Sequence, residues 1–203
     1  MNPIQPKKLF ETIRIENGKA AHLNYHNKRL NQSRALLFGL HNPIDITTYL
    51  ANPPSKGLYR AKLIYDHKEI QINYYAYKPK PIRSLKLIES DISYAFKALD
   101  RKHLESLRED ADEYDDVLIL KNGYLTDTSI ANIALRQHGI WYTPAAPLLA
   151  GTTRARLLES GKLIPREIPA SDIHHYDSLA LMNAMIGFSI LEKVSLSLPI
   201  RDI

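Results

Sequence analysis

The sequence predicts an α+β protein of two lobes: a small N-terminal α/β lobe over residues 1–77 and a larger C-terminal lobe of mixed β-strands with helices over residues 85–203. Three observations support this prediction. β-rich runs meet at Asn-Gly pairs, which is typical of β-hairpins. Helical stretches that stop at a glycine occur in both halves. Between the halves, residues 78–84 are basic and Pro-rich, and the prolines stiffen this segment into an interdomain linker.

The N-terminal lobe is predicted from two hairpins and a helix. Residues 9–15 alternate as a strand does, and the Asn17-Gly18 pair turns the chain into a short return strand over residues 20–23. Leucines among polar residues predict a helix that ends at Gly39. The elements that follow the first hairpin are a helix over residues 25–37, a short helix over 43–50, and strands over 57–65 and 69–77.

The C-terminal lobe is predicted as short strands arranged around a central hairpin. The apolar run over residues 117–120 precedes the Asn122-Gly123 pair, and His138-Gly139 marks a further turn. Gly161 stops a helix that begins after Gly151. The other predicted elements are a strand over 85–88, a helix through Leu104 and Leu107 that leads into an acidic stretch, strands over 133–136 and 140–142, and a buried strand within 179–188.

Composition narrows the possible chemistry. The chain has no cysteine, which excludes disulfides, iron-sulfur clusters and thiolate sites, and no pair among its eight histidines has a zinc-like context, so no metal site is predicted. The net charge is +5, but Lys and Arg are interleaved with 22 acids, which favours a mildly basic surface over nucleic-acid binding. The same excess suits a small anionic substrate or a phosphate. Without a long apolar run or a signal peptide, a cytoplasmic protein without membrane contact is expected.

The stretch over residues 123–133 reads Gly-Tyr-Leu-Thr-Asp-Thr-Ser-Ile-Ala-Asn-Ile. On spacing alone it is a hairpin. Its wording resembles the signature of class IV pyridoxal-phosphate enzymes, the fold-type-IV family of branched-chain and D-amino-acid aminotransferases and aminodeoxychorismate lyases. The family usually has Glu where Asp127 stands. The resemblance implies that Asp127 pairs with the pyridine nitrogen of pyridoxal 5'-phosphate, with one methylene less than Glu.

Three further phrases resemble the cofactor-binding parts of that family. His26-Asn-Lys-Arg29-Leu resembles the phrase whose arginine grips the phosphate, a role that suits a planar guanidinium. Gly151, Thr152 and Thr153 resemble the phrase opposite it, where a helix start offers N–H groups to an anion. Asn183-Ala184 resembles a lyase phrase. Each has a structural alternative: an exposed helix arginine, an ordinary helix start, or a buried strand.

Lys97 is the candidate catalytic lysine by the same resemblance. Lys97-Ala-Leu-Asp-Arg101 resembles the family phrase Lys-x-Leu-Asn-Arg, which lies about thirty residues before the signature and carries the lysine that forms the Schiff base. Lys102 and Lys121 compete with it, but neither has the surrounding phrase. The resemblance implies that Lys97 binds the cofactor covalently and then serves as general acid and base.

The choice of reaction depends on two positions. Thr12 lies in Phe10-Glu-Thr-Ile-Arg14, where lyases of the family commonly have threonine and aminotransferases glycine, and a hydroxyl there could relay a proton as pyruvate leaves. Together with Asn183-Ala184, Thr12 favours a 4-amino-4-deoxychorismate lyase, which forms 4-aminobenzoate and pyruvate for folate biosynthesis. Arg60 falls where relatives place an arginine that faces a substrate carboxylate, although an ordinary strand arginine explains it equally well. The family forms homodimers, so a homodimer is predicted.

Three alternatives remain open. An amino-acid aminotransferase of the branched-chain or D-amino-acid type uses the same cofactor. A member that binds pyridoxal phosphate with little turnover would explain Asp127 and the absence of the first strand with which relatives begin. A basic RNA-binding module would bind nucleic acid in a salt-dependent manner and be insensitive to Lys97→Ala.

Overall fold

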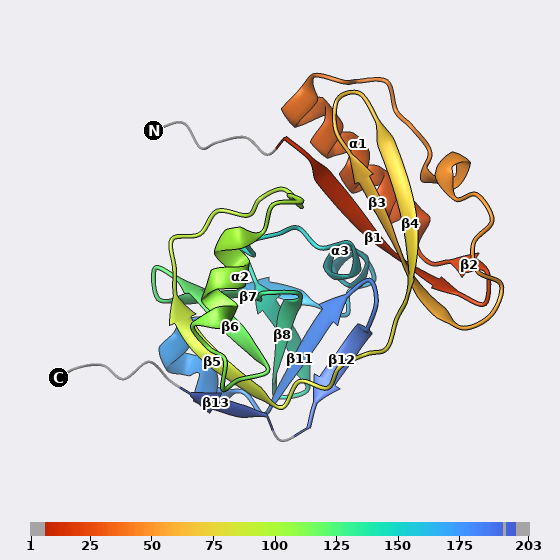
Figure 1. The fold of residues 1–203 in the computed structure, drawn as a ribbon. Helices are drawn as coiled ribbons and strands as arrows, with labels where there is room; N and C mark the ends of the chain where they lie inside the picture. Colours follow the sequence, from red (N-terminus) through yellow and green to blue (C-terminus); the bar gives the residue numbers. More distant parts are fainter. Residues whose placement is uncertain (1–6, 193, 198–203) are drawn as a thin grey trace. The chain divides into compact units, whose positions relative to one another are not determined.

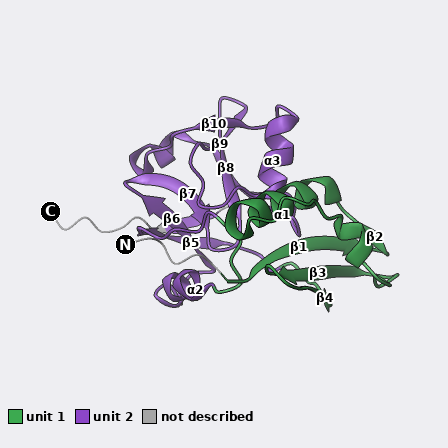
Figure 2. Cartoon of the chain, turned by 90° about the horizontal axis from the view of Figure 1, so that it is seen from above, with its two compact units in different colours: residues 1–79, 96–100 green, residues 80–95, 101–203 purple. Residues whose placement is uncertain are grey.

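The computed structural model describes residues 7–192 and 194–197. The chain divides into two compact units (Figure 2): unit 1 comprises Met1–Pro79 with Phe96–Asp100, and unit 2 comprises Lys80–Ala95 with Arg101–Ile203. Each unit has its own sheet and its own core, so each is described by itself. Among the described residues, no helix is long and apolar enough to cross a membrane.

Unit 1 is an antiparallel sheet with strand order β2-β1-β3-β4, covered on one face by α1 (Figure 1). Asn17 and Gly18 adopt positive φ angles of 49° and 80°, which a tight hairpin turn requires. Gly39 ends the helix in the left-handed conformation, with φ of 66°. The elements are β1 Leu9–Glu16, β2 Lys19–Ala20, α1 Leu23–Phe38, the 3-10 helix η1 Ile46–Tyr49, β3 Leu58–Tyr65 and β4 Ile70–Ala76.

The alternation of β1 determines what each face of this sheet carries. Leu9, Ile13 and Ile15 are fully buried and pack with Leu30 of α1 and Leu63 of β3. Residues at even positions of β1 point to the second face. The hydrophobic core therefore lies between the sheet and α1, and the second face is left with mostly polar side chains.

The segment Phe96–Asp100 contacts β1, although the sequence analysis placed it in the C-terminal lobe. The backbone N–H of Phe10 donates to the carbonyl of Lys97 at 3.0 Å, and Leu9 forms an isolated antiparallel bridge with Ala98. β2 pairs only with Ile15 and Glu16 at one end of β1, so these bonds provide partners for backbone groups at its other end. Long-range hydrogen bonding therefore assigns Lys97 to unit 1.

Unit 2 is a mixed sheet whose main path runs β10-β9-β8-β7-β6-β5-β13, with β11 pairing β8 and β12. The β5–β6, β5–β13 and β9–β10 pairs are parallel and the others antiparallel. The elements are β5 Ser84–Glu89, α2 Lys102–Glu109, β6 Asp116–Lys121, β7 Tyr124–Thr128, β8 Asn132–Gln137, β9 Ile140–Pro144, α3 Thr152–Glu159, β10 Ile164–Arg166, the 3-10 helix η2 Ala170–His175, β11 Ser178–Asn183, β12 Gly187–Leu191 and β13 Ser195–Ser197.

The two predicted turns of unit 2 have the backbone that their residues favour. Asn122 and Gly123 have φ of 54° and 77°, and His138 and Gly139 have φ of 51° and 80°. Positive φ at both central residues matches the twist of paired strands. The central hairpin, the α+β class and the helix that ends before Gly161 are confirmed. β10, β13 and η2 were not predicted from the sequence, and β11 and β12 were predicted as one segment.

Candidate active site

In unit 1, a buried carboxylate joins β1 to α1. Glu11 is 0% exposed and points toward the helix, where His26 and Arg29 lie three residues apart on one helical face. The Glu11 carboxylate accepts hydrogen bonds from Nε of Arg29 at 2.8 Å and from its Nη2 at 2.6 Å. His26 Nδ1 lies 2.6 Å from Glu11 Oε2. Arg29 is thus held in a bidentate pair.

The charge state of Glu11 follows from these partners. Burial by itself would raise the pKa of Glu11, but the charge of Arg29 and the hydrogen bonds from His26 and Arg29 outweigh it and lower the pKa to about 2. The carboxylate is therefore ionised at neutral pH, and His26 Nδ1 carries the proton that they share. Glu11 and His26 fix the orientation of Arg29.

Lys97 contacts the side chain of Phe10 on β1, and Thr12 lies two residues further along the same strand. Lys97 Nζ lies 4.7 Å from the centroid of the Phe10 ring, and Lys62 Nζ lies 5.2 Å from the same centroid. Thr12 is half-buried and stands directly opposite Lys62 in the β1–β3 register. Lys97 and Arg29 therefore both lie against β1, Lys97 beside the Phe10 ring and Arg29 at the Glu11 carboxylate.

Arg60 is on the same face as Thr12, two residues along β3 from Lys62. Its guanidinium carbon lies 5.3 Å from the centroid of the Tyr75 ring, and Arg14 stands opposite it on β1. Its Nε is buried and has no hydrogen-bond partner among the described residues. A buried donor without a protein acceptor is costly, and an anionic ligand would supply that acceptor.

In unit 2, Asp127 lies at the end of β7 and is 4% exposed. Its Oδ1 accepts a hydrogen bond from Nδ2 of Asn132 at 2.7 Å, and its Oδ2 accepts one from the backbone N–H of Leu149 at 2.9 Å. Burial raises the pKa of Asp127 to about 6, because these neutral donors and the charge of Arg154 compensate only in part. Asp127 is a buried carboxylate that a further cationic group would stabilise.

Asn132 connects Asp127 to the loop before α3. Its Nδ2 also donates to the Leu149 carbonyl at 2.8 Å, so one amide nitrogen holds both a carboxylate and the loop backbone. A Cβ at Gly151 would lie 1.9 Å from Asn132 Oδ1. Only glycine fits at this position, because Asn132 approaches the backbone closely. Gly151 was predicted from the sequence to bind phosphate, whereas its close approach to Asn132 is evident only in the structure.

The first turn of α3 follows directly from this loop. Thr152 and Thr153 are buried, and the first backbone N–H groups of a helix have no acceptor within the helix. Arg154 is also buried, and its Nη2 donates to the Pro144 carbonyl at 2.8 Å. Burial lowers the pKa of Arg154, and the charge of Asp127 opposes that shift. The structure thus brings Asp127, Gly151, Thr152 and Thr153 together.

Asn183 and Ala184 lie at the turn between β11 and β12. Asn183 Oδ1 accepts hydrogen bonds from the backbone N–H groups of Met185 at 2.9 Å and Ile186 at 3.1 Å. Its Nδ2 donates to the carbonyl of Ile130 at 3.3 Å. Asn183 therefore stabilises its own turn and ties it to the turn between β7 and β8.

Four residues with clear structural roles in these groups had no role in the sequence analysis: Glu11, His26, Asn132 and Arg154. Glu11, His26 and Asn132 lie inside the phrases that carried the family resemblance, and Arg154 directly follows Thr153, so the phrases themselves were the available signal. Their contacts could not be derived from spacing, because Glu11 and His26 are 15 positions apart and Arg154 reaches Pro144 across 10.

The chain belongs to the class IV aminotransferase family. The model of that family matches residues 71–194. The family implies pyridoxal phosphate as the cofactor, and the chain is a pyridoxal-phosphate-dependent enzyme with the fold-type-IV architecture that the sequence predicted.

Particular relatives cover nearly the whole chain. An uncharacterised protein of Haemophilus influenzae is 38% identical over 188 residues, which make up 88% of this chain and 98% of that protein. A crystal structure from Haemophilus somnus, of a provisionally assigned 4-amino-4-deoxychorismate lyase, is 37% identical with a TM-score of 0.83 and covers 89% of this chain and 97% of its own. A provisionally assigned amino-acid aminotransferase from Mesorhizobium loti is 22% identical with a TM-score of 0.82, covering 94% and 99%, and shows a likeness of fold alone.

Proposed function

We propose that this chain is a 4-amino-4-deoxychorismate lyase that holds pyridoxal 5'-phosphate at the residues described above and releases pyruvate and 4-aminobenzoate. The observation that carries the proposal is that Lys97 and Thr12 share one sheet face, beside Phe10 and Lys62. The proposed reacting amine and the hydroxyl that favours the lyase reaction would then have a common location. The 37% identity to the Haemophilus somnus protein supports the same reaction.

The chemistry of the donors fits the cofactor. Thr152 and Thr153 add buried hydroxyls to the N–H groups at the start of α3, a set suited to a phosphate. Arg29, whose guanidinium Glu11 holds through Nε and Nη2, would bind the phosphate. Asp127 offers the buried carboxylate that a pyridinium nitrogen requires. Asn183 and Ala184 would act through the turn that they form.

Each residue then has a defined task. Pyridoxal phosphate, when bound, supplies an aldehyde for an amine and a ring that delocalises electrons. Lys97 would bind the cofactor through its amine and, once released by the substrate amine, carry a proton to and from the reacting carbon. Thr12 would place a hydroxyl where the departing side chain needs a proton, and Arg60 would bind a substrate carboxylate.

The shorter side chain of Asp127 is compatible with its proposed role. Asn132 and Leu149 fix both carboxylate oxygens, so the group does not depend on the length of its own side chain for orientation. With a pKa of about 6, Asp127 is mostly ionised at neutral pH even before a cation lowers that pKa further. The carboxylate would keep the ring nitrogen protonated.

The test is a visible absorbance spectrum combined with product analysis. Purified protein mixed with pyridoxal phosphate should develop the absorbance band of a lysine-linked cofactor, and Lys97→Ala should lose both this band and more than about 1000-fold of the turnover. Lys102→Ala, a neighbouring lysine outside the proposed site, is the matched control and should retain both. Borohydride reduction and peptide mass mapping should locate the cofactor on residue 97.

Incubation with 4-amino-4-deoxychorismate should yield 4-aminobenzoate and pyruvate. Absence of 4-aminobenzoate, together with amino transfer between amino donors and keto acids, would replace the lyase with an aminotransferase. A band without either reaction would indicate a cofactor-binding protein with little turnover. The proposal places the enzyme in folate biosynthesis, in the cytoplasm and as a homodimer, and sedimentation of the purified protein tests the last of these.

A further inference from the structure

The sheet face of unit 1 that points away from α1 concentrates positive charge. Arg14 on β1 stands opposite Arg60 on β3, and Thr12 stands opposite Lys62. Lys97 adds a further ammonium, since Lys97 Nζ and Lys62 Nζ lie 4.7 Å and 5.2 Å from the centroid of the same Phe10 ring. Like charges gathered on one face repel each other, so this arrangement favours a bound anion.

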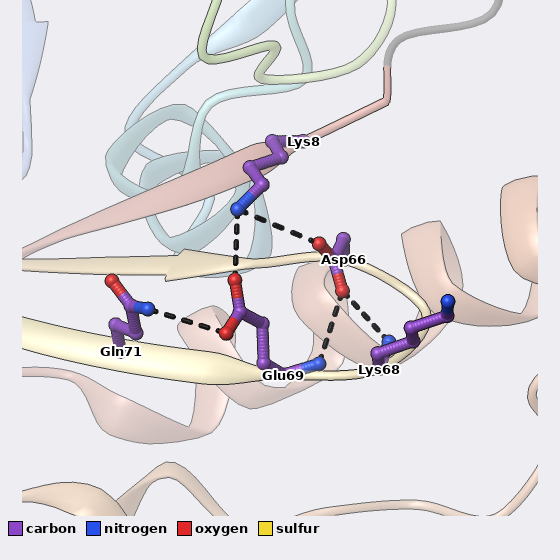
Figure 3. Close-up of polar contacts among 5 residues, drawn as sticks. All are labelled: Lys8, Asp66, Lys68, Glu69 and Gln71. Atoms are coloured by element: carbon purple, nitrogen blue, oxygen red, sulfur yellow. Dashed lines mark hydrogen bonds and ion pairs between the residues drawn. The ribbon is translucent and has the colours of Figure 1, made fainter.

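Acidic residues at the two ends of this sheet have basic partners. At the β3–β4 hairpin, Lys8 Nζ lies 2.8 Å from Glu69 Oε1 and 3.7 Å from Asp66 Oδ2 (Figure 3). Asp66 Oδ1 also accepts hydrogen bonds from the backbone N–H groups of Lys68 and Glu69. At the other end of β1, Glu16 pairs with Arg14 at 3.0 Å. Asp66, Glu69 and Glu16 are therefore balanced by these basic groups.

Arg60 and Lys62 occupy different parts of this face. Arg60 has a buried Nε without a hydrogen-bond partner among the described residues, and it is the predicted carboxylate ligand. Lys62 lies two residues along the same strand, about 7 Å away at the backbone. Its ammonium shares an aromatic neighbour with Lys97, so it lies at the reacting end of the proposed site.

We propose that Lys62 is a specificity-determining residue that binds a second acid group of the substrate, so that the site selects amines bearing two acid groups, one held at Arg60 and one at Lys62. The proposal rests on the proposed function in one respect, that Lys97 is the reacting amine. No role for Lys62 was predicted from the sequence. A strand lysine beside a phenylalanine is unremarkable until the fold places Lys97 against the same ring.

The test compares a rigid dicarboxylate with a monocarboxylate as probes. Terephthalate and benzoate share one aromatic ring and differ by one carboxylate, and calorimetry measures their binding to the cofactor-loaded enzyme. Wild type should bind terephthalate about tenfold more tightly than benzoate, the ratio expected for one charge-assisted hydrogen bond. Lys62→Met, which keeps an unbranched side chain and removes the ammonium, should abolish this ratio without changing benzoate affinity, and Lys62→Arg should retain most of it.

Lys28→Met, an exposed lysine of α1, is the matched control and should leave the ratio unchanged. With 4-amino-4-deoxychorismate, Lys62→Met should raise KM about tenfold and change kcat little. If Lys62→Met lost affinity for both probes equally, or for neither probe, the proposed role of Lys62 would be refuted. The absorbance band of the lysine-linked cofactor should persist in Lys62→Met. Its absence from wild type would instead refute the proposed function, and the probe ratio would still decide whether Lys62 binds an acid group.

Discussion

Glu11 of unit 1 and Asp127 of unit 2 are both buried carboxylates, yet their pKa values shift in opposite directions. Burial acts on both to raise the pKa. Glu11 has a bidentate arginine and a histidine, which together lower its pKa to about 2. Asp127 is held by the neutral donors of Asn132 and Leu149, and its pKa rises to about 6. The difference shows that charged partners stabilise the ionised form of Glu11, whereas neutral donors compensate only in part for the burial of Asp127.

The largest effect is expected from Glu11→Gln. Removing one partner of a buried ion pair leaves Arg29 and His26 without their carboxylate, which should lower the free energy of unfolding by about 4 kcal/mol. Because the pKa of Glu11 is lowered, its contribution is complete above pH 4.5 and is lost as the pH falls toward 2. Urea denaturation at several pH values measures both effects. Glu16→Gln removes the exposed pair with Arg14 and is the control, which should lower the free energy of unfolding by at most about 1 kcal/mol. If the two variants lowered it equally, the assignment of Glu11 as a buried ion-pair partner would be contradicted.

A smaller effect of opposite sign is expected at Asp127. Its pKa is raised by folding, so the folded protein holds a proton that the unfolded chain releases, and stability should fall as the pH rises from 3.8 to about 6. The expected loss is about 3 kcal/mol in the cofactor-free protein. Asp127→Asn should flatten this dependence, and saturating pyridoxal phosphate should reverse it in wild type. Parallel pH profiles for wild type and variant would show that Asp127 does not titrate in this range.

The smallest effect concerns the link between Asp127 and α3. Gly151→Ala would place a Cβ 1.9 Å from Asn132 Oδ1, and the forced displacement should cost about 2 kcal/mol of stability and raise the pKa of Asp127 further. In an Asn132→Ala background the same change should cost much less, because the clashing atom is gone. A double-mutant cycle measures this coupling. Additive costs would show that Asn132 does not impose the glycine.

The sequence predicted the parts of the fold that depend on neighbouring residues. The Asn-Gly turns, the end of α1 at Gly39 and the strand alternation of β1 all follow from local backbone sterics and side-chain patterning. β10 and β13 were missed because each has only three residues, and Pro165 lies within β10. Such segments become strands only through their parallel partners, β9 and β5.

The candidate site also has features that the sequence predicted and features that it did not. The phrases around Arg29, Lys97, Asp127 and Gly151 identified the residue types and the family, and the family match confirms that membership. Their surroundings were not predictable: the sequence placed Lys97 in the C-terminal lobe, whereas hydrogen bonds to β1 place it in unit 1.

The amino-acid sequence alone determined the family, the turn positions and the identities of the candidate catalytic groups, because motifs and turns are set by residues close together in the chain. Only the tertiary structure decided that Glu11 is paired with Arg29, that Asp127 is held by neutral donors, and that Lys62 joins Lys97 beside Phe10. The physical reason is that burial and Coulomb energy depend on distances through space, which separation along the chain does not determine.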